Sequence, residues 1–144
     1  MPNDSRQLSL PMNLRVLPDR SYFATVAGHN RGATGREDAA LRTDDARPAF
    51  HGRSVWWHVT VPATGEFELL SDTHGSAIDT TLSVWLPDAA RPLANDNDPR
   101  RPGPASAVRQ RINLRKGQKI ILAIDGVDGA QGLVKLNVRL KLVK

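Results

Sequence analysis

Alternation of apolar and polar residues constrains this chain more than any other feature of its sequence. The clearest run lies near the C-terminus, where every second residue from 134 to 142 is Val or Leu. Because side chains on a strand point alternately to opposite faces, this pattern predicts a strand with one face in a core and the other in solvent. Similar runs of strand-forming residues lie at 8–16, 22–26, 54–61, 66–71, 80–86, 107–114 and 118–125.

Turn residues separate the predicted strands. Segments 62–65 (PATG) and 115–117 (RKG) are short, and each predicts a tight hairpin. Two longer segments, 28–52 and 87–104, have no clear strand pattern, and the second contains five prolines that favour an extended surface loop. Seven or eight short strands and no long helix in 144 residues predict one all-β domain, an antiparallel β-sandwich with long surface loops, over 1–144.

The composition excludes several classes of protein and of site. The chain has no cysteine, which excludes disulfides, thiolate catalysis and Cys-ligated zinc. No apolar run approaches the roughly 20 residues that a membrane-spanning helix needs. Residues 1–19 contain no continuous apolar segment, so no secretory signal is expected there.

Charge is divided unevenly along the chain. Residues 1–99 carry 9 Lys and Arg against 13 Asp and Glu, whereas residues 100–144 carry 11 against 2. Such a basic region can attract nucleic acid, an acidic polysaccharide or an acidic protein, although these charges can also be ordinary solvated strand faces.

Two stripes would form one basic face if their strands share a sheet. No aromatic residue interleaves with these stripes in the sequence, which argues against nucleic acid and leaves an acidic protein neighbour or polymer as the expected partner. The stripes are Arg109, Arg111 and Arg115, and Lys135, Arg139 and Lys141.

Two further groups of residues are candidates for binding. Trp56 and Trp57 are adjacent, so they face opposite sides of a strand: one can anchor the core, whereas Trp56, like Trp85, is either buried or exposed as a binding platform. Asn95, Asp96 and Asp98 place oxygen-bearing side chains in one loop, and calcium takes six to eight oxygen ligands. Asx turns are the structural alternative, so we expect no required cofactor and keep calcium as a candidate ligand.

The residues of a catalytic site are not grouped in the sequence. The four histidines show no metalloprotease spacing. Asp72, His74 and Ser76 supply the residue types of a triad without a nucleophile elbow. We therefore predict that the protein is not an enzyme.

Five short motifs follow one another along the chain: 52–57 (GRSVWW), 61–65 (VPATG), 79–85 (DTTLSVW), 95–97 (NDN), and 117–126 with Gly129 and Gly132. Together they resemble the bacterial pre-peptidase C-terminal (PPC) domain family, over roughly residues 21–140. The resemblance implies a jelly-roll-like β-sandwich with 21–144 as its core and 1–20 as an N-terminal strand or extension. It also implies a non-catalytic role and an extracellular or surface location. Some members of the family bind calcium or adhere to polymers such as collagen or polysaccharide.

These observations predict a module that binds or assembles. The leading prediction is a structural or decoration subunit of a larger surface or virion assembly, in which the long strands 8–16 and 133–143 pair with neighbours through free edges. The first alternative is an extracellular adhesion module that binds polysaccharide or a protein polymer, with calcium as a stabilising ion. The second is an accessory module or prodomain of a secreted hydrolase. The resemblance favours an extracellular, cell-surface or virion location, whereas the missing signal leaves the location open.

Overall fold

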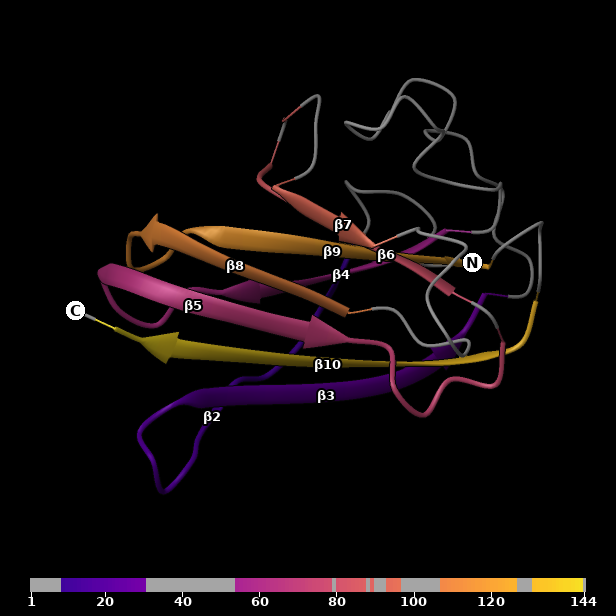
Figure 1. Ribbon diagram of the computed structural model, residues 1–144, viewed down its shortest axis with the longest axis horizontal. Helices are drawn as coiled ribbons and strands as arrows, with labels where there is room; N and C mark the ends of the chain where they lie inside the picture. The colour runs from indigo at the N-terminus through magenta and orange to yellow at the C-terminus, as the bar shows by residue number, and fades with distance from the viewer. Residues whose placement is uncertain are drawn as a thin grey trace.

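The computed structural model describes residues 9–30, 54–78, 80–87, 89, 93–96, 107–126 and 131–143, with only the backbone described at 94–96 and 126. In these ranges ten strands form two five-stranded sheets (Figure 1). Sheet A has the order β1-β4-β9-β6-β7 and sheet B the order β2-β3-β10-β5-β8. The strands are β1 (Leu10–Pro11), β2 (Arg15–Val16), β3 (Tyr22–His29), β4 (Val55–Thr60), β5 (Gly65–Asp72), β6 (Thr80–Trp85), β7 (Ala94–Asp96), β8 (Ala107–Leu114), β9 (Lys119–Gly126) and β10 (Leu133–Leu142).

Eight of the strands pair in a nested order. β3 pairs with β10, β4 with β9, β5 with β8 and β6 with β7, and all four pairs are antiparallel. The β10–β5 pairing completes sheet B and the β9–β6 pairing completes sheet A. Nested pairing divided between two sheets is the connectivity of a jelly roll. The predicted all-β, jelly-roll-like sandwich is therefore confirmed.

The predicted single strand 8–16 is wrong. Its residues form two short edge strands in different sheets: β1 runs parallel to β4 in sheet A, and β2 runs antiparallel to β3 in sheet B. Met12 lies between them and belongs to the core, and its backbone N donates to the His58 carbonyl at 2.8 Å. The alternating residues 8–16 belong to a segment that passes from the edge of sheet A to the edge of sheet B. Such a segment cannot be one continuous strand.

The two predicted hairpins are also wrong, although both turns exist. β4 and β5 lie in different sheets, as do β8 and β9, so segments 62–65 and 115–117 cross between the sheets. The two crossings run together: Val61 N donates to Gln118 O, Gly117 N donates to Val61 O, and Lys116 N donates to the Thr64 hydroxyl. Gly117 has a φ of 89°, a conformation that favours glycine. The turn residues therefore determine where the chain reverses its direction, but they do not determine which strands pair.

Both segments without a clear strand pattern contribute residues to strands. β3 continues to His29 inside segment 28–52, and the backbone of Ala94–Asp96 forms β7 inside the predicted loop 87–104. β7 pairs with β6, and Leu82 lies opposite Asp96 in this pairing. The described residues contain no helix that is long and apolar enough to span a membrane.

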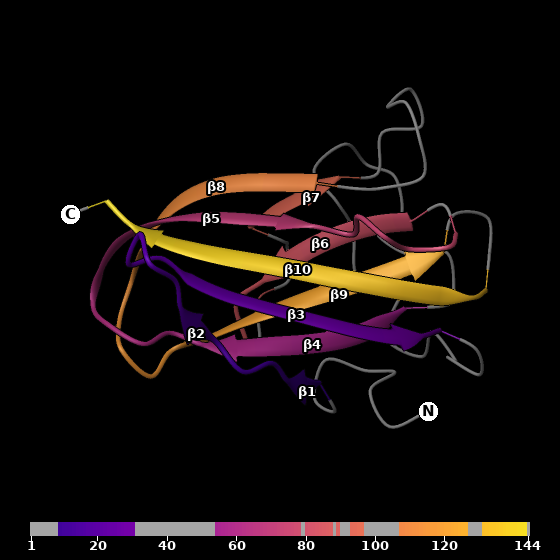
Figure 2. The same cartoon turned by 90° about the horizontal axis from the view of Figure 1, so that it is seen from below.

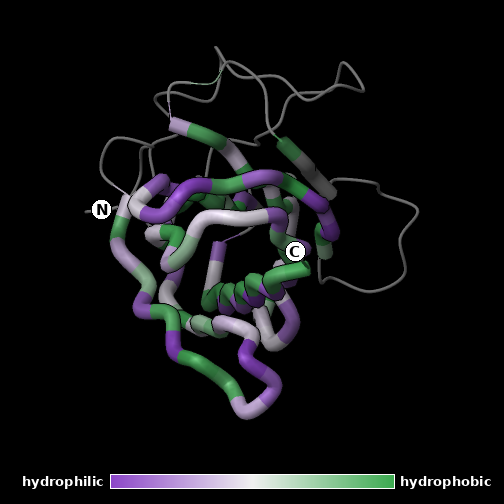
Figure 3. Tube along the Cα trace, turned by 90° about the vertical axis from the view of Figure 1, so that its left-hand side faces the viewer, coloured by the Kyte–Doolittle hydropathy of each residue, from purple (hydrophilic) through white to green (hydrophobic). Residues whose placement is uncertain are grey.

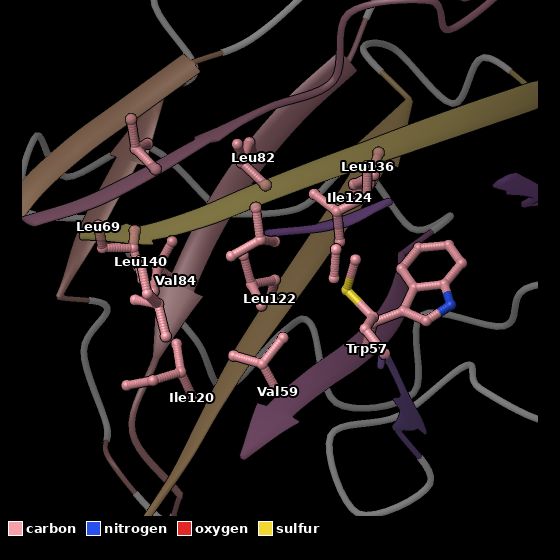
Figure 4. Packing of buried hydrophobic residues seen from close by; sticks show 14 of the residues in the cluster. Trp57, Val59, Leu69, Leu82, Val84, Ile120, Leu122, Ile124, Leu136 and Leu140 are labelled. Atoms are coloured by element: carbon pink, nitrogen blue, oxygen red, sulfur yellow. The ribbon is translucent and has the colours of Figure 1, made fainter. Parts of the chain in front are cut away.

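The core lies between the two sheets and is formed by the apolar positions of the alternating strands. Figure 3 shows this alternation along β10 as it approaches the C-terminus. Side chains from both sheets meet in Figure 4, among them Trp57 and Leu122 from sheet A and Leu136 and Leu140 from sheet B. Trp57 comes so close to β3 that a Cβ at Gly28 would lie 3.2 Å from its Cζ2 atom. The inward direction predicted for the 55–61 alternation is confirmed.

Candidate ligand-binding face

Sheet B turns its second face away from the core, and this outer face carries most of the exposed charge of the described residues. Figure 2 looks onto this sheet, with β8, β5, β10, β3 and β2 following one another from top to bottom. The outward positions are the odd-numbered residues of β3, β8 and β10 and the even-numbered residues of β5, because the intervening residues enter the core.

One row of side chains crosses all five strands of this face. Arg15 lies opposite Phe23, Phe23 opposite Arg139, Arg139 opposite Leu70, and Leu70 opposite Arg109. In this central row cationic and apolar side chains therefore alternate. Adjacent strands are about 4.8 Å apart, so successive arginine positions are about 10 Å apart.

A hollow of about 330 Å³ lies in the middle of the central row. Phe23 and Leu70 are half-buried on either side of the exposed Arg139. This volume is at the lower end of the range of small-ligand pockets, roughly 300–1,000 Å³. The lining residues are Phe23, Leu70, Asp72, Asn137, Val138 and Arg139.

A hydrogen-bonded network fixes the polar wall of the hollow. The Thr25 hydroxyl donates to Asn137 Oδ1 at 2.8 Å, and Asn137 Nδ2 donates to Asp72 Oδ1 at 2.8 Å and to the His74 carbonyl at 3.2 Å. The His74 backbone N also donates to Asp72 Oδ1, at 3.0 Å. Among the described residues both hydrogen bonds to the Asp72 carboxylate use Oδ1, which leaves Oδ2 to accept a hydrogen bond from a ligand.

The cations of this face differ in their neighbours. Arg109 pairs with Glu68 at 3.9 Å and Arg111 with Glu66 at 3.8 Å, distances at which surface ion pairs are weak. Within the described ranges Arg139 takes part in no ion pair. The Arg139 side chain is therefore the charge in the hollow that is most available to a ligand.

Two electrostatic interactions occur at the β2–β3 end of the central row. The Arg15 guanidinium lies 5.6 Å from the centroid of the Phe23 ring, a cation–π contact. Hydrogen bonds from the Ser21 side chain and backbone lower the pKa of Asp19, and the positive charges of Arg139 and Lys141 add smaller contributions. Asp19 is thus a carboxylate close enough to sense the charge of the central row.

The predicted continuous basic face is wrong in one respect. Its two strands do share sheet B, but β5 lies between them and places Glu66, Glu68 and Asp72 among the cations. The stripe residues Arg109, Arg111, Lys135, Arg139 and Lys141 are exposed on this mixed face.

Arg115 lies beyond the end of β8, where a second hollow of about 450 Å³ is lined by Thr64, Gly65, Glu66, Asn113, Leu114, Arg115 and Gln118.

Sequence reasoning missed Phe23, which stands beside both Arg15 and Arg139. Phe23 thus supplies an aromatic side chain beside the basic residues that neither stripe contains in the sequence. The signal was the apolar run at 22–26, which could have been placed beside the basic stripe only by pairing the first long strand with the last.

The interpretation of Trp56 and Trp85 as exposed platforms is wrong, and the alternative of burial is confirmed. Both side chains are 0% exposed, and their ring centroids lie 6.1 Å apart with the planes inclined at 50°. They form a second apolar cluster with Ile121 and Ala123, and Trp85 Nε1 donates to the Ser83 hydroxyl at 2.8 Å. Two large rings with apolar neighbours gain most by leaving water.

The remaining candidate residues do not form a described site. Asn95 and Asp96 lie on β7, where the structure describes the backbone, and Asp98 lies outside the described residues. Among the described residues no group of three or more His, Asp or Glu could hold a metal ion, and calcium binding stays a prediction.

The three residues that have the types of a triad are separated by their contacts. Asp72 accepts from the backbone of His74, not from its ring. The Ser76 hydroxyl bonds to the backbone of Lys135. No relay from carboxylate through imidazole to hydroxyl is formed by these three side chains.

Comparisons with known proteins give similar structures but no relative by sequence. No protein-family model and no curated protein matches the chain. A periplasmic inhibitor of g-type lysozyme from Aeromonas hydrophila is 10% identical, with a TM-score of 0.48, over 92% of this chain and 94% of that one. The pre-peptidase C-terminal domain of a Bacillus anthracis collagenase is 16% identical, with a TM-score of 0.45, over 79% and 86%.

A carbohydrate-binding module from Cellvibrio mixtus lichenase 5A, solved in complex with cellotriose, is also similar in structure. It is 12% identical, with a TM-score of 0.37, over 92% of this chain and 88% of that one. The family that the sequence motifs resemble is thus represented among the similar structures.

Proposed function

We propose that this protein is a non-catalytic binding module that holds a segment of a polysaccharide on the outer face of sheet B. The observation that carries the proposal is the hollow in the central row, where apolar Phe23 and Leu70 flank Arg139 beside the Asn137–Asp72 wall. Ligand sites combine apolar surface with a few fixed polar groups. The C–H faces of a sugar ring pack on the apolar side chains, and its hydroxyls bond to the polar wall.

An extended ligand fits this face better than a compact one. The central row crosses five strands, which corresponds to about 19 Å from Arg15 to Arg109. A single sugar fills the hollow, whereas a polymer segment also reaches the arginines at the two ends of the row. A polysaccharide is met outside the cell or at its surface, which agrees with the location implied by the family resemblance.

The leading prediction is assembly through the free edges of strands 8–16 and 133–143, and only the first of these lies at sheet edges, as the two-residue strands β1 and β2. β10 is paired on both sides, with β3 and β5, so strand 133–143 offers no free edge. β8 is the long edge strand of sheet B, but it carries the exposed Arg109 and Arg111, and the Gln110 side chain donates to the Arg111 carbonyl at 3.1 Å. Charged and polar groups of this kind on an edge strand disfavour its pairing with a strand of another molecule. The structural-subunit and hydrolase-accessory roles remain predictions without this support.

A matched pair of variants tests the proposal. Leu70→Glu places a carboxylate in the hollow beside Arg139, whereas Leu133→Glu places the same charge elsewhere on the face, at a side chain that is 64% exposed. Affinity electrophoresis against a panel of soluble polysaccharides measures binding. We expect retardation of the wild type and of Leu133→Glu by at least one polymer, and loss of that retardation in Leu70→Glu. No retardation by any polymer, or equal retardation of both variants, would contradict the proposal.

A further inference from the structure

We infer that the bound polysaccharide is acidic, with carboxylate or sulfate groups on its sugars, and that Arg139 receives one such group. This inference rests on the proposed function and specifies its ligand. It follows from three features of the outer face: the distribution of charge over the two halves of sheet B, the surroundings of the Arg139 guanidinium, and the position of Asp72 relative to it.

The excess of positive charge on the outer face of sheet B is concentrated on one half of that face. On the β5–β8 half, Glu66 and Glu68 accompany Arg111 and Arg109 in ion pairs. On the β2–β3–β10 half, the exposed cations outnumber the described carboxylates near them, which are Asp72, Asp19 and Glu68, the last opposite Lys141; the cations are Arg15, Lys135, Arg139 and Lys141. A negative group is therefore drawn to the second half, where Arg139 is the cation that lines the hollow.

The surroundings of Arg139 strengthen its interaction with an acid. Phe23 and Leu70 stand on both sides of it in register, so a sugar ring that packs on them displaces water from beside the guanidinium. A charge pair is stronger where water is displaced, and a guanidinium binds planar oxyanions through two parallel hydrogen bonds.

Asp72 distinguishes a sugar acid from other polyanions. It lies opposite Asn137, two residues along β10 from Arg139, which places the acceptor about 7 Å from the arginine position. A ligand must therefore offer a hydrogen-bond donor close to its negative group, and a sugar acid carries hydroxyl and acid on one ring. A DNA phosphodiester chain has no hydroxyl beside its negative group and so offers Asp72 no hydrogen-bond donor there.

The experiment compares each of two acidic polymers with its neutral counterpart. Isothermal titration measures the binding of the full chain to polygalacturonate and to its fully methyl-esterified form, and to dextran sulfate and dextran. We expect at least one acidic polymer to bind at least about tenfold more tightly than its neutral counterpart, and we expect added salt to weaken that binding. The carboxylate and sulfate pairs identify which acid is preferred.

Variants then locate the acid-binding group. Arg139→Gln is expected to weaken binding of the acidic polymer about 10- to 100-fold, as for loss of a charge-assisted hydrogen bond, and Arg139→Lys to have an intermediate effect. Arg111→Gln is the control, because it removes another exposed arginine of the same face that lies outside the hollow and pairs with Glu66. Its binding should stay within about threefold of wild type.

Separate results overturn the inference and the proposed function. Equal binding of acidic and neutral polymers that Leu70→Glu abolishes overturns the acid preference and keeps the binding face. Binding of RNA or poly-L-glutamate in place of the sugar polymers, with the same dependence on Arg139, overturns the choice of a sugar acid. Equal losses in Arg139→Gln and Arg111→Gln overturn the assignment to the hollow, because they indicate attraction by overall charge.

Discussion

Truncation of Met12 tests how the N-terminal segment is held against the sandwich. This segment contributes an edge strand to each sheet, and Met12 enters the core between β1 and β2 with only 6% of its surface exposed. Replacing a buried methionine by alanine costs about 2–5 kcal/mol, partly through the cavity that remains. Because Met12 lies where the chain crosses at the sheet edges, its surroundings can relax, and we expect a loss of about 2–3 kcal/mol in Met12→Ala.

Chemical denaturation monitored by tryptophan fluorescence measures this loss. In a domain of this size it corresponds to a fall in Tm of about 6–10 °C. Leu10→Ala is the control, since Leu10 is 39% exposed on β1, and its loss should stay below about 1 kcal/mol. A loss below about 0.5 kcal/mol in Met12→Ala would refute the packing of this segment across the two sheets.

Three further predictions concern the core, the effect of pH and the candidate metal. Gly28→Ala should destabilise the fold by about 1–2 kcal/mol, because the new Cβ presses on Trp57; Ala27→Ser, which changes the exposed neighbouring residue, should be nearly neutral in the same denaturation assay. Burial, and then the charge of Lys119, lower the pKa of His58, and a hydrogen bond with the Ser9 backbone opposes them in part. Since the unfolded chain then binds the proton more readily, this stabilisation is complete above about pH 6.5 and is lost as the pH falls through the folded pKa. A stability–pH slope that is unchanged in His58→Gln would contradict this. If Asp96 helps to hold calcium, added calcium raises Tm relative to EDTA and Asp96→Asn removes the rise, whereas an equal Tm in calcium and EDTA rejects the site.

The sequence predicted the class of fold because alternation is a local property. The runs ending in Val61 and Leu140 show in a few residues which side chains face a core, and the structure has those residues where the period of two puts them, whereas Leu142 at the end of β10 is 43% exposed. The turns at 62–65 and 115–117 were recognised for the same reason. Which strand the chain joins after a turn is not local, because it depends on where the next apolar face finds a partner. That is why two crossings between sheets were predicted as hairpins.

The candidate site was predictable only in part for a related physical reason. Arg139 was recognised from its own strand, but the pairing of β3 with β10 joins segments more than 100 residues apart and brings Phe23 beside it. The acidic residues of β5 lie between the two basic stripes because a jelly roll inserts an early strand between later ones. Trp56 and Trp85 come from strands separated by β9, so their contact could not be inferred from either run alone.

The position of the ligand on the protein is the most direct test of the proposed binding face. Backbone amide NMR spectra of the full chain, recorded during titration with an oligosaccharide of the polymer that binds, report which strands the ligand contacts. We predict that the largest shifts fall on β3, β5 and β10 around Phe23, Leu70 and Arg139, and that Arg139→Gln removes them at the same ligand concentration. Shifts centred on sheet A around Trp56 and Trp85, with the central row unchanged, would contradict the account.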